Sequence, residues 1–360
     1  MDDFDKRLLN ILQMNLPLET TPYAAMGEQL ELSEADVIAR VGALKQAKIL
    51  RQVSAIFDTR KIGYRSSLVA MKVAPDRIHK AARVINEHPG VSHNYERNHP
   101  FNLWFTVAVP PPSTVEEHVD ALHRKAGGEV TRILQTLKLF KIGVKLDMTG
   151  KSDITARDPG AVRREADWNV GRALSPLDVQ LVRELQKDLL LAPHPFAPAS
   201  AKLGMSEAEL LGHAQRMIDD GIMRRFAAVL YHRKAGFKAN AMGVWRAPED
   251  RVEELGFQMA SFAAVSHCYQ RPIYPDWPYN IFTMVHGRTS EECERVLAAI
   301  SEDTGVTDYV SLYSSREYKK TRVEYFTDEY ADWERKFLGE VKIDLGGLPM
   351  QAPASAPVPA

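Results

Sequence analysis

The stretch VSHNYER, residues 91–97, returns almost unchanged as VSHCYQR at residues 265–271. The similarity extends outward, because residues 1–52 align without a gap with residues 174–225. A repeat of this length decides the architecture before any single element is considered. The chain of 360 residues therefore consists of two copies of one design.

Each copy combines three short helical patterns with a βαββαβ pattern. In the first copy, apolar residues after Asp5 recur at helical spacing, a second short helix follows, and Ser33 caps a third. Strand and helix patterns then follow in the order strand, helix, strand, strand, helix, strand. We expect these six elements at residues 67–74, 75–90, 91–97, 101–109, 113–127 and 139–148. The second copy repeats the order from residues 239–246 to residues 310–326.

This order predicts an α+β protein in which a helix-turn-helix unit and a ferredoxin-like βαββαβ domain occur twice in tandem. A polar stretch separates the copies, and the end of the chain is rich in Pro and Ala, which favours disorder there. The expected segments are helix-turn-helix units at 1–52 and 174–225, ferredoxin-like domains at 53–150 and 226–326, a linker at 151–173 and a tail at 327–360.

Composition excludes several classes of protein. The formal net charge is -1, so the chain lacks the basic excess that is typical of DNA-binding proteins. No apolar run approaches the roughly 18 residues of a membrane span, and the N-terminus lacks a signal-peptide pattern, so we expect a cytoplasmic protein without a membrane partner. Cys268 and Cys293 are too few for a disulfide framework or a zinc or iron–sulfur site, and we expect reduced thiols.

The repeated stretch places polar side chains where a strand normally carries apolar ones. Side chains two apart in a strand point to the same face, so His93, Tyr95 and Arg97 form one row, which His99 continues. We call His93, Tyr95 and Arg97 the first row. Because helices cover one face of a ferredoxin-like sheet, we expect this row on the open face.

The second copy carries a matching second row, His267, Tyr269 and Arg271. Two open faces packed together, as related halves can be, would enclose a slot suited to a ligand. The copies differ at one place, because Ile273 stands where the first copy has His99. We therefore expect the two halves not to be interchangeable.

Aromatic and basic residues border both rows. Trp104 lies among aromatic residues that could form the walls of a site for a flat ligand, although ordinary core packing explains it as well. Basic pairs recur just before each sheet, and either ligand carboxylates or plain solvation could account for them. The pairs are Arg60 with Lys61 and Arg233 with Lys234.

The order of elements resembles the Lrp/AsnC family of transcription regulators. Within it, HNYERNHPFNLWFT at residues 93–106 and SHCYQRPIYPDWPYN at residues 266–280 resemble the two subunit types of siroheme decarboxylases, here fused in one chain. The resemblance implies removal of the acetate carboxyl groups at C12 and C18 of siroheme, giving 12,18-didecarboxysiroheme. The product would serve heme d1 synthesis or an alternative heme route.

The resemblance also implies roles for individual residues. One or both of His93 and His99 would donate the proton, to the pyrrole or to the nascent methyl carbon, and Arg97 would orient an acetate of the substrate that remains ionised. His267 would be a second acid or an axial ligand of the substrate iron, a role also open to His93. The remaining expected substrate contacts are Tyr95, Asn102, Trp104, Tyr269, Arg271 and the two basic pairs. No cofactor beyond the iron of the substrate is implied.

Two other functions stay open at this point, a DNA-binding regulator and a heme sensor without turnover. A regulator presents basic and amide side chains on its third helix, because that helix meets phosphates and base edges. Here the third helix of each copy begins with acids, at Glu34 and Asp36 and at Glu207 and Glu209. Acids at that place would repel DNA. We expect the helical units to act in packing, within one chain or between two chains.

Overall fold

The computed structural model describes residues 2–142, 156–157, 173–230 and 239–346. Each copy begins with three helices, as the sequence predicts. Side chains of Asp2, Ser33, Ser175 and Ser206 accept hydrogen bonds from free N–H groups at helix starts, which fixes where those helices begin. The helices are α1 (Asp3–Met14), α2 (Pro22–Leu30) and α3 (Glu34–Gln46), then α6 (Pro176–Leu185), α7 (Ala197–Leu203) and α8 (Glu207–Asp219).

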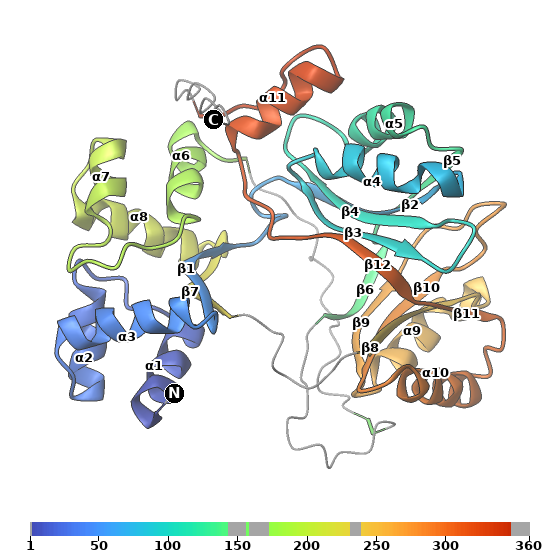
Figure 1. Ribbon diagram of the computed structural model, residues 1–360, viewed down its shortest axis with the longest axis horizontal. Coiled ribbons are helices and arrows are strands. Elements are labelled where there is room, and N and C mark those ends of the chain that lie inside the picture. The colour runs from blue at the N-terminus through green and yellow to red at the C-terminus, as the bar shows by residue number, and fades with distance from the viewer. Residues whose placement is uncertain (1, 143–155, 158–172, 231–238, 347–360) are drawn as a thin grey trace.

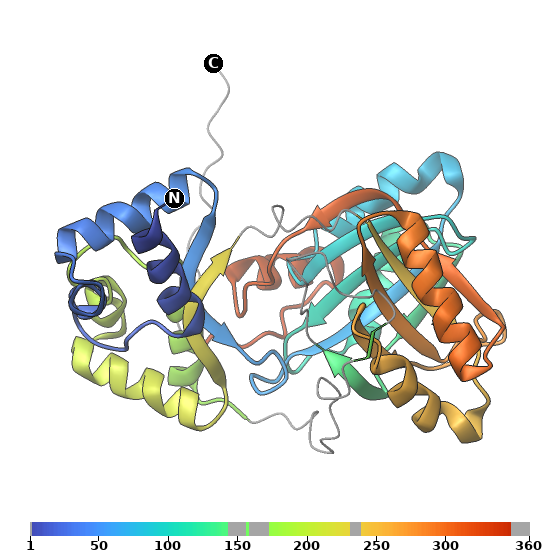
Figure 2. The same ribbon diagram turned by 90° about the horizontal axis from the view of Figure 1, so that it is seen from below.

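The two helical units form an internal pair at one end of the molecule (Figures 1 and 2). Strand β1 (Leu50–Phe57) of the first unit pairs antiparallel with β7 (Met223–Leu230) of the second. Tyr23 Oη donates to the Leu190 carbonyl oxygen at 2.9 Å across the pair. Leu8, Val41, Leu185, Phe226 and similar residues of both units share one apolar core. This arrangement shows the helical units packing on each other, as expected.

The first sheet has the ferredoxin-like order β3-β4-β2-β5, with every neighbour antiparallel. Helices α4 (Ile78–Asn86) and α5 (Val115–Ala126) cover one face, where Val69, Leu103 and Phe105 lie in the shared core. The strands are β2 (Arg65–Lys72), β3 (Val91–Arg97), β4 (Leu103–Val109) and β5 (Val130–Leu134).

The second sheet repeats this design with the order β11-β8-β10-β9. Helices α9 (Val252–Ala260) and α10 (Ser290–Thr304) cover one of its faces. Its strands are β8 (Ala239–Trp245), β9 (Val265–Gln270), β10 (Ile281–Gly287) and β11 (Tyr309–Leu312).

Each half also lends a fifth strand to the sheet of the other half. Strand β6 (Lys138–Ile142) pairs with β9, and β12 (Ser314–Lys320) pairs with β3. The expectation that residues 139–148 complete the first sheet is therefore wrong, because β5 fills that place and β6 crosses to the second sheet; residues 143–148 lie outside the described part. The expected strand at 310–326 is likewise two strands, which Tyr313 separates as the chain changes sheets.

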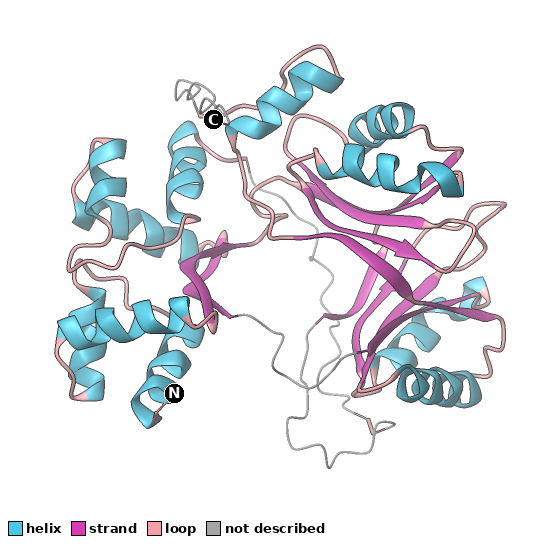
Figure 3. Cartoon of the chain, in the orientation of Figure 1, coloured by secondary structure: helices cyan, strands magenta, loops and turns pink. Residues whose placement is uncertain are grey.

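The helices lie on the outside of the two sheets, and the open faces of the sheets meet (Figure 3). Trp104 of the first sheet and Phe282 of the second belong to one apolar cluster between the sheets, whereas Phe105 packs toward the helices of its own sheet. The rows therefore lie on faces that meet, as the sequence predicts.

Part of the segment expected as a tail is folded. Helix α11 (Asp328–Phe337) packs on the first sheet domain, where Trp333 joins its core. Residues beyond it return to the second helical unit, where Gln180 Nε2 donates to the Gly346 carbonyl oxygen at 2.6 Å. Residues 347–360, expected to be disordered, lie outside the described residues, as does most of the expected linker.

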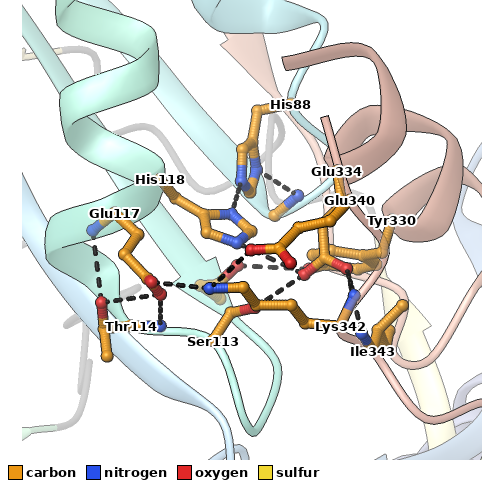
Figure 4. A network of polar contacts seen from close by, with 12 residues as sticks. His88, Ser113, Thr114, Glu117, His118, Tyr330, Glu334, Glu340, Lys342 and Ile343 are labelled. Carbon is orange, nitrogen blue, oxygen red and sulfur yellow. Dashed lines mark hydrogen bonds and ion pairs between the residues drawn. The ribbon is translucent and has the colours of Figure 1, made fainter. Parts of the chain in front are cut away.

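A buried polar network holds α11 in place (Figure 4). The Gly90 N–H donates to His88 Nδ1 at 2.9 Å, and His88 Nε2 lies 2.8 Å from His118 Nδ1. His118 Nε2 lies 3.4 Å from Glu334 Oε1, and both side chains are fully buried. Glu334 also accepts from Ser113 Oγ at 2.8 Å and from the backbone N–H groups of residues 342 and 343. One carboxylate thus fixes α5, α11 and the segment that follows.

The expectations of no membrane span and of reduced cysteines can be compared with the structure. None of the helices in the described residues is long and apolar enough to cross a membrane. Cys268 and Cys293 are both buried free thiols, as expected. Burial raises the pKa of both thiols above their ordinary value, so they are protonated at neutral pH.

Candidate active site

The first row lies on the open face of β3. His93 Nδ1 lies 2.9 Å from Ser92 Oγ, and Ser92 Oγ lies 2.8 Å from Thr106 Oγ1 on β4. The rings of His93 and Tyr95 are neighbours, with centroids 6.1 Å apart. Burial lowers the pKa of His93, and the charge of Lys320 lowers it further, while Glu317 raises it. This imidazole is held by hydroxyl groups through one nitrogen, which leaves Nε2 for proton transfer.

In the second row, a serine hydroxyl again holds the histidine, but that hydroxyl contacts another histidine instead of a threonine. His267 Nδ1 lies 2.8 Å from Ser266 Oγ, and that oxygen lies 2.7 Å from His286 Nε2. Burial, His286 and Arg271 lower the pKa of His267 to about 4, so this imidazole is neutral at pH 7. The repeat did not reveal His286, because the equivalent residue of the first copy is Ala108.

The arginines of both rows tie the halves together. Arg97 Nη1 donates to the Leu312 carbonyl oxygen at 3.0 Å, and Arg271 Nη1 donates to the Leu134 carbonyl oxygen. Both guanidinium groups are buried among aromatic rings, and both Nε atoms are covered. Burial lowers the pKa of each to about 10, so they remain charged. Nη1 of each arginine is occupied by a carbonyl oxygen of the other half and Nε is covered, so a bidentate contact with a carboxylate would require the guanidinium to move. Their role as substrate contacts stays a prediction.

His99 lies at the other end of the first row. It follows Arg97, which stands four strand residues or roughly 13 Å from His93. The His99 ring packs edge-on against Trp277 of the second half, with centroids 5.2 Å apart. Its Nδ1 accepts from the Phe101 N–H at 3.0 Å, so the neutral ring carries its proton on Nε2. The structure therefore does not bring the two expected acids together.

Aromatic side chains fill the space beside His99. Trp104 is only 1 % exposed, and its ring lies 5.2 Å from that of Trp277. Trp104 Nε1 donates to the Phe101 carbonyl oxygen at 2.6 Å. Trp104 is therefore a core residue between the sheets in this structure, which was one of its two expected roles.

The side chain of Asn102 forms hydrogen bonds with the backbone of Val73. Its amide accepts from the Val73 N–H at 3.0 Å and donates to the Val73 carbonyl oxygen at 2.8 Å. Asn280 holds Ala247 in the same way, at 2.9 and 2.8 Å. Since both polar ends of the Asn102 amide are occupied, we leave it out of the substrate site.

Replacing Asn102 with Ala should lower the free energy of unfolding by about 1–3 kcal/mol, because two peptide groups of Val73 lose their partner. Asn280→Ala should cost a similar amount, and neither variant should change KM. Urea unfolding and steady-state kinetics measure the two quantities. Unchanged stability together with a raised KM for Asn102→Ala would return this residue to the substrate site.

Arg60 and Lys61, the basic pair of the first copy, contact Asp58. Arg60 Nε lies 3.6 Å from Asp58 Oδ1, and the backbone N–H of Lys61 donates to the same oxygen at 3.3 Å. Burial raises the pKa of Tyr269, while the charges of Arg271 and Arg60 lower it. Arg60 of the first half therefore lies near the second row. Arg233 and Lys234 fall outside the described residues.

The chain matches two family models and, over nearly its whole length, a relative. A model of the AsnC-like ligand binding domain matches residues 61–141 and 234–319, and a model of the siroheme decarboxylase NirDL-like HTH domain matches residues 5–51 and 178–224. A siroheme decarboxylase of Hydrogenobacter thermophilus is 38% identical over 341 residues, which cover 94% of this chain and 99% of the relative. The chain belongs to the siroheme decarboxylase family.

Other members of the family bear on the tandem design. The siroheme decarboxylase beta subunit of Methanosarcina barkeri is 47% identical over 146 residues, which cover 96% of that subunit and 41% of this chain. The crystal structure of the siroheme decarboxylase NirDL in co-complex with an iron-uroporphyrin III analogue covers 94% of this chain and 99% of its own, with 32% identity and a TM-score of 0.75. The predicted fused form of the family is thus confirmed.

Proposed function

We propose that this protein is a carboxy-lyase that removes the C12 and C18 acetate carboxyl groups of siroheme, giving 12,18-didecarboxysiroheme for heme d1 synthesis or an alternative heme route. The observation that carries the proposal is the similarity to a siroheme decarboxylase over nearly the whole of both chains. The iron-uroporphyrin analogue in the related crystal structure supports an iron tetrapyrrole as the ligand.

The reaction requires a proton at a defined carbon. When the bond between the acetate methylene and its carboxylate breaks, carbon dioxide leaves and the electron pair passes into the pyrrole ring system. A proton then reaches the methylene carbon, which becomes a methyl group. No oxidant or nucleophile is consumed, and we propose that no cofactor beyond the substrate iron takes part. An imidazole with an ordinary pKa near neutrality suits this step.

We assign the proton transfer to His93 and keep His99 as a second donor for the other acetate. The two lie too far apart to serve one carbon, but a macrocycle presents its acetates at separate places. His267 is neutral and already held through Nδ1, as metal-ligating histidines usually are. Its Nε2 therefore suits the substrate iron, although a second proton transfer remains the alternative for this residue.

The charges on the helical units support an enzyme over a regulator. Arg40 of α3 pairs with Asp2 at 2.8 Å and with Asp5 at 2.7 Å, so its charge is neutralised within its own unit. Arg216 of α8 lies 3.3 Å from Asp178, the residue of the second unit that corresponds to Asp5. Cations neutralised in this way contribute little to binding phosphates.

Anaerobic incubation of the protein with siroheme should give stepwise loss of two carbon dioxide units, detected by mass analysis of the extracted tetrapyrrole. Tight binding of siroheme without any mass change would instead identify a sensor. Binding to DNA that weakens steeply with salt, with siroheme unchanged, would favour a regulator.

A further inference from the structure

The two strands that cross between the halves differ in charge where they meet the rows. On β12, Glu317 stands opposite Tyr95 and Lys320 stands opposite His93. On β6, the equivalent places opposite Tyr269 and His267 are held by Leu139 and Ile142. The first row is therefore bordered by two charged side chains from the other half of the chain, and the second row by apolar ones.

The pairing of β12 with β3 decides which of its side chains share the face of the first row, because the register shifts between Glu317 and Lys319 and strict alternation is interrupted there. Tyr318 faces the helices, because its Oη lies 2.7 Å from His79 Nδ1 of α4. Lys319 also faces that side, since its Nζ donates to the Asn86 carbonyl oxygen at 2.9 Å. Glu317 and Lys320 are paired with Tyr95 and His93, so they lie on the open face with the first row.

Lys320 is placed to receive an anion. Its side chain is exposed and stands opposite His93 on β3. After burial, its charge is a further cause that lowers the pKa of His93 and of His286, so the ammonium lies near both imidazoles. Across the four described stretches of the chain, no residue forms a hydrogen bond or ion pair with this ammonium. The arginines of the rows differ in this respect, because their guanidinium groups are covered and bonded to carbonyl oxygens.

We propose that Lys320 binds an ionised carboxylate of the substrate beside His93, so that the productive first row is completed by a strand from the second half of the chain. This proposal rests on the proposed function, since siroheme carries the carboxylates concerned. An exposed ammonium can form charge-assisted hydrogen bonds to a carboxylate without losing an existing partner. Glu317 opposes the effect of Lys320 on the pKa of His93, which stays below its ordinary value in the free protein.

Lys320→Ile tests this assignment with little risk to the fold, because Ile is the residue at the equivalent place on β6 and suits a strand. We expect this variant to bind iron uroporphyrin about tenfold more weakly, measured by titration of the Soret band, and to raise KM for siroheme by a similar factor. Lys320→Arg should restore most of the affinity, because it keeps the charge.

The matched control is Arg316→Ile, which removes an exposed cation from the opposite face of the same strand. Its affinity for iron uroporphyrin should equal that of the unmodified protein. Wild-type affinity in Lys320→Ile, or an equal loss in Arg316→Ile, would overturn the assignment. If the unmodified protein leaves siroheme unchanged, the proposed function fails, but the iron uroporphyrin titration still decides whether Lys320 binds carboxylates.

Discussion

Replacing His93 with Gln is expected to lower kcat for siroheme decarboxylation by about 10²–10⁴-fold, the usual contribution of a positioned acid. Gln can keep the contact with Ser92 Oγ, which lies 2.9 Å from His93 Nδ1, but it cannot deliver a proton. Binding of iron uroporphyrin should change little, because the side chain keeps its size and polarity. Single-turnover decay of siroheme under anaerobic conditions measures the chemical step.

If His93 is the proton donor, its pKa determines how kcat/KM and kcat change with pH. Burial and the nearby charge of Lys320 lower the pKa of His93 below 6.5, against a smaller opposing effect of Glu317. The acid form is therefore present only at low pH in the free protein, and kcat/KM should fall as pH rises through a value below 6.5. A bound substrate with several carboxylates favours the imidazolium, so the fall in kcat should occur at higher pH. His93→Gln should remove both transitions.

His79→Gln is the matched control for His93→Gln. His79 lies on the helix face of the same sheet, where its Nδ1 meets Tyr318 Oη at 2.7 Å, so it is remote from the open face. Activity of this variant should be unchanged. If His93→Gln retains wild-type single-turnover rates, His93 does not supply the proton, and His99 becomes the first candidate.

The repeat allowed the order of elements and the facing rows to be predicted from the sequence. Residues 91–97 are a strand, and both histidine rows lie on faces that meet, because side chains alternate in any strand. The strand exchange could not be predicted, since the apolar residues along 138–142 fit a strand but do not indicate which sheet receives it. For that reason Lys320, which comes from the other half, was not among the candidate residues.

Other differences have local causes. Strand β5 was missed because it is five residues long and largely half-exposed, so it has no clear alternation. Helix α11 could have been found, because Tyr330, Trp333 and Phe337 recur at helical spacing. The Pro- and Ala-rich residues after it led us to treat the whole segment as tail. The arginines were expected to face a ligand, but a strand pattern does not reveal a partner on the opposite sheet.

Replacing Glu334 with Gln is expected to lower the free energy of unfolding by about 3 kcal/mol at pH 7, the largest effect on stability that we predict. The buried carboxylate accepts hydrogen bonds from Ser113 Oγ and two backbone N–H groups, and His118 Nε2 lies 3.4 Å away. Gln has one acceptor oxygen, and its amide N–H would face at least one of these donors. A donor left without an acceptor in a buried site destabilises the folded state.

The hydrogen bonds of His88 and His118 determine which ring nitrogen of each carries the proton. His88 Nδ1 accepts from the Gly90 N–H, so His88 must carry its proton on Nε2 and donate it to His118 Nδ1. His118 then carries its proton on Nε2, which points at Glu334. Ser113 Oγ and His118 Nε2 face Oε1 of Glu334, whereas the N–H groups of residues 342 and 343 donate to Oε2. Gln offers an acceptor at only one of these two places, so the donors at the other place lose their acceptor.

Acid should reduce the difference between Glu334→Gln and the unmodified protein. Burial opposes ionisation of Glu334, but hydrogen bonds from His118, residues 342 and 343, and Ser113 outweigh it and lower the pKa from 4.5 to about 2. A lowered folded-state pKa stabilises above pH 4.5, and this stabilisation is lost as pH falls toward 2. The difference in unfolding free energy should therefore shrink from about 3 kcal/mol at pH 7 to about 2 kcal/mol at pH 3.5.

Glu87→Gln provides the comparison that separates this network from ordinary surface charge. Glu87 pairs with Lys336 of α11 at 2.5 Å, but both side chains are largely exposed, so its loss should cost less than about 1 kcal/mol. Urea unfolding of both variants at the two pH values measures the contrast. Equal, small effects in the two variants would mean that α11 is held by its apolar face, through Trp333 and Tyr330, and that the buried carboxylate adds little.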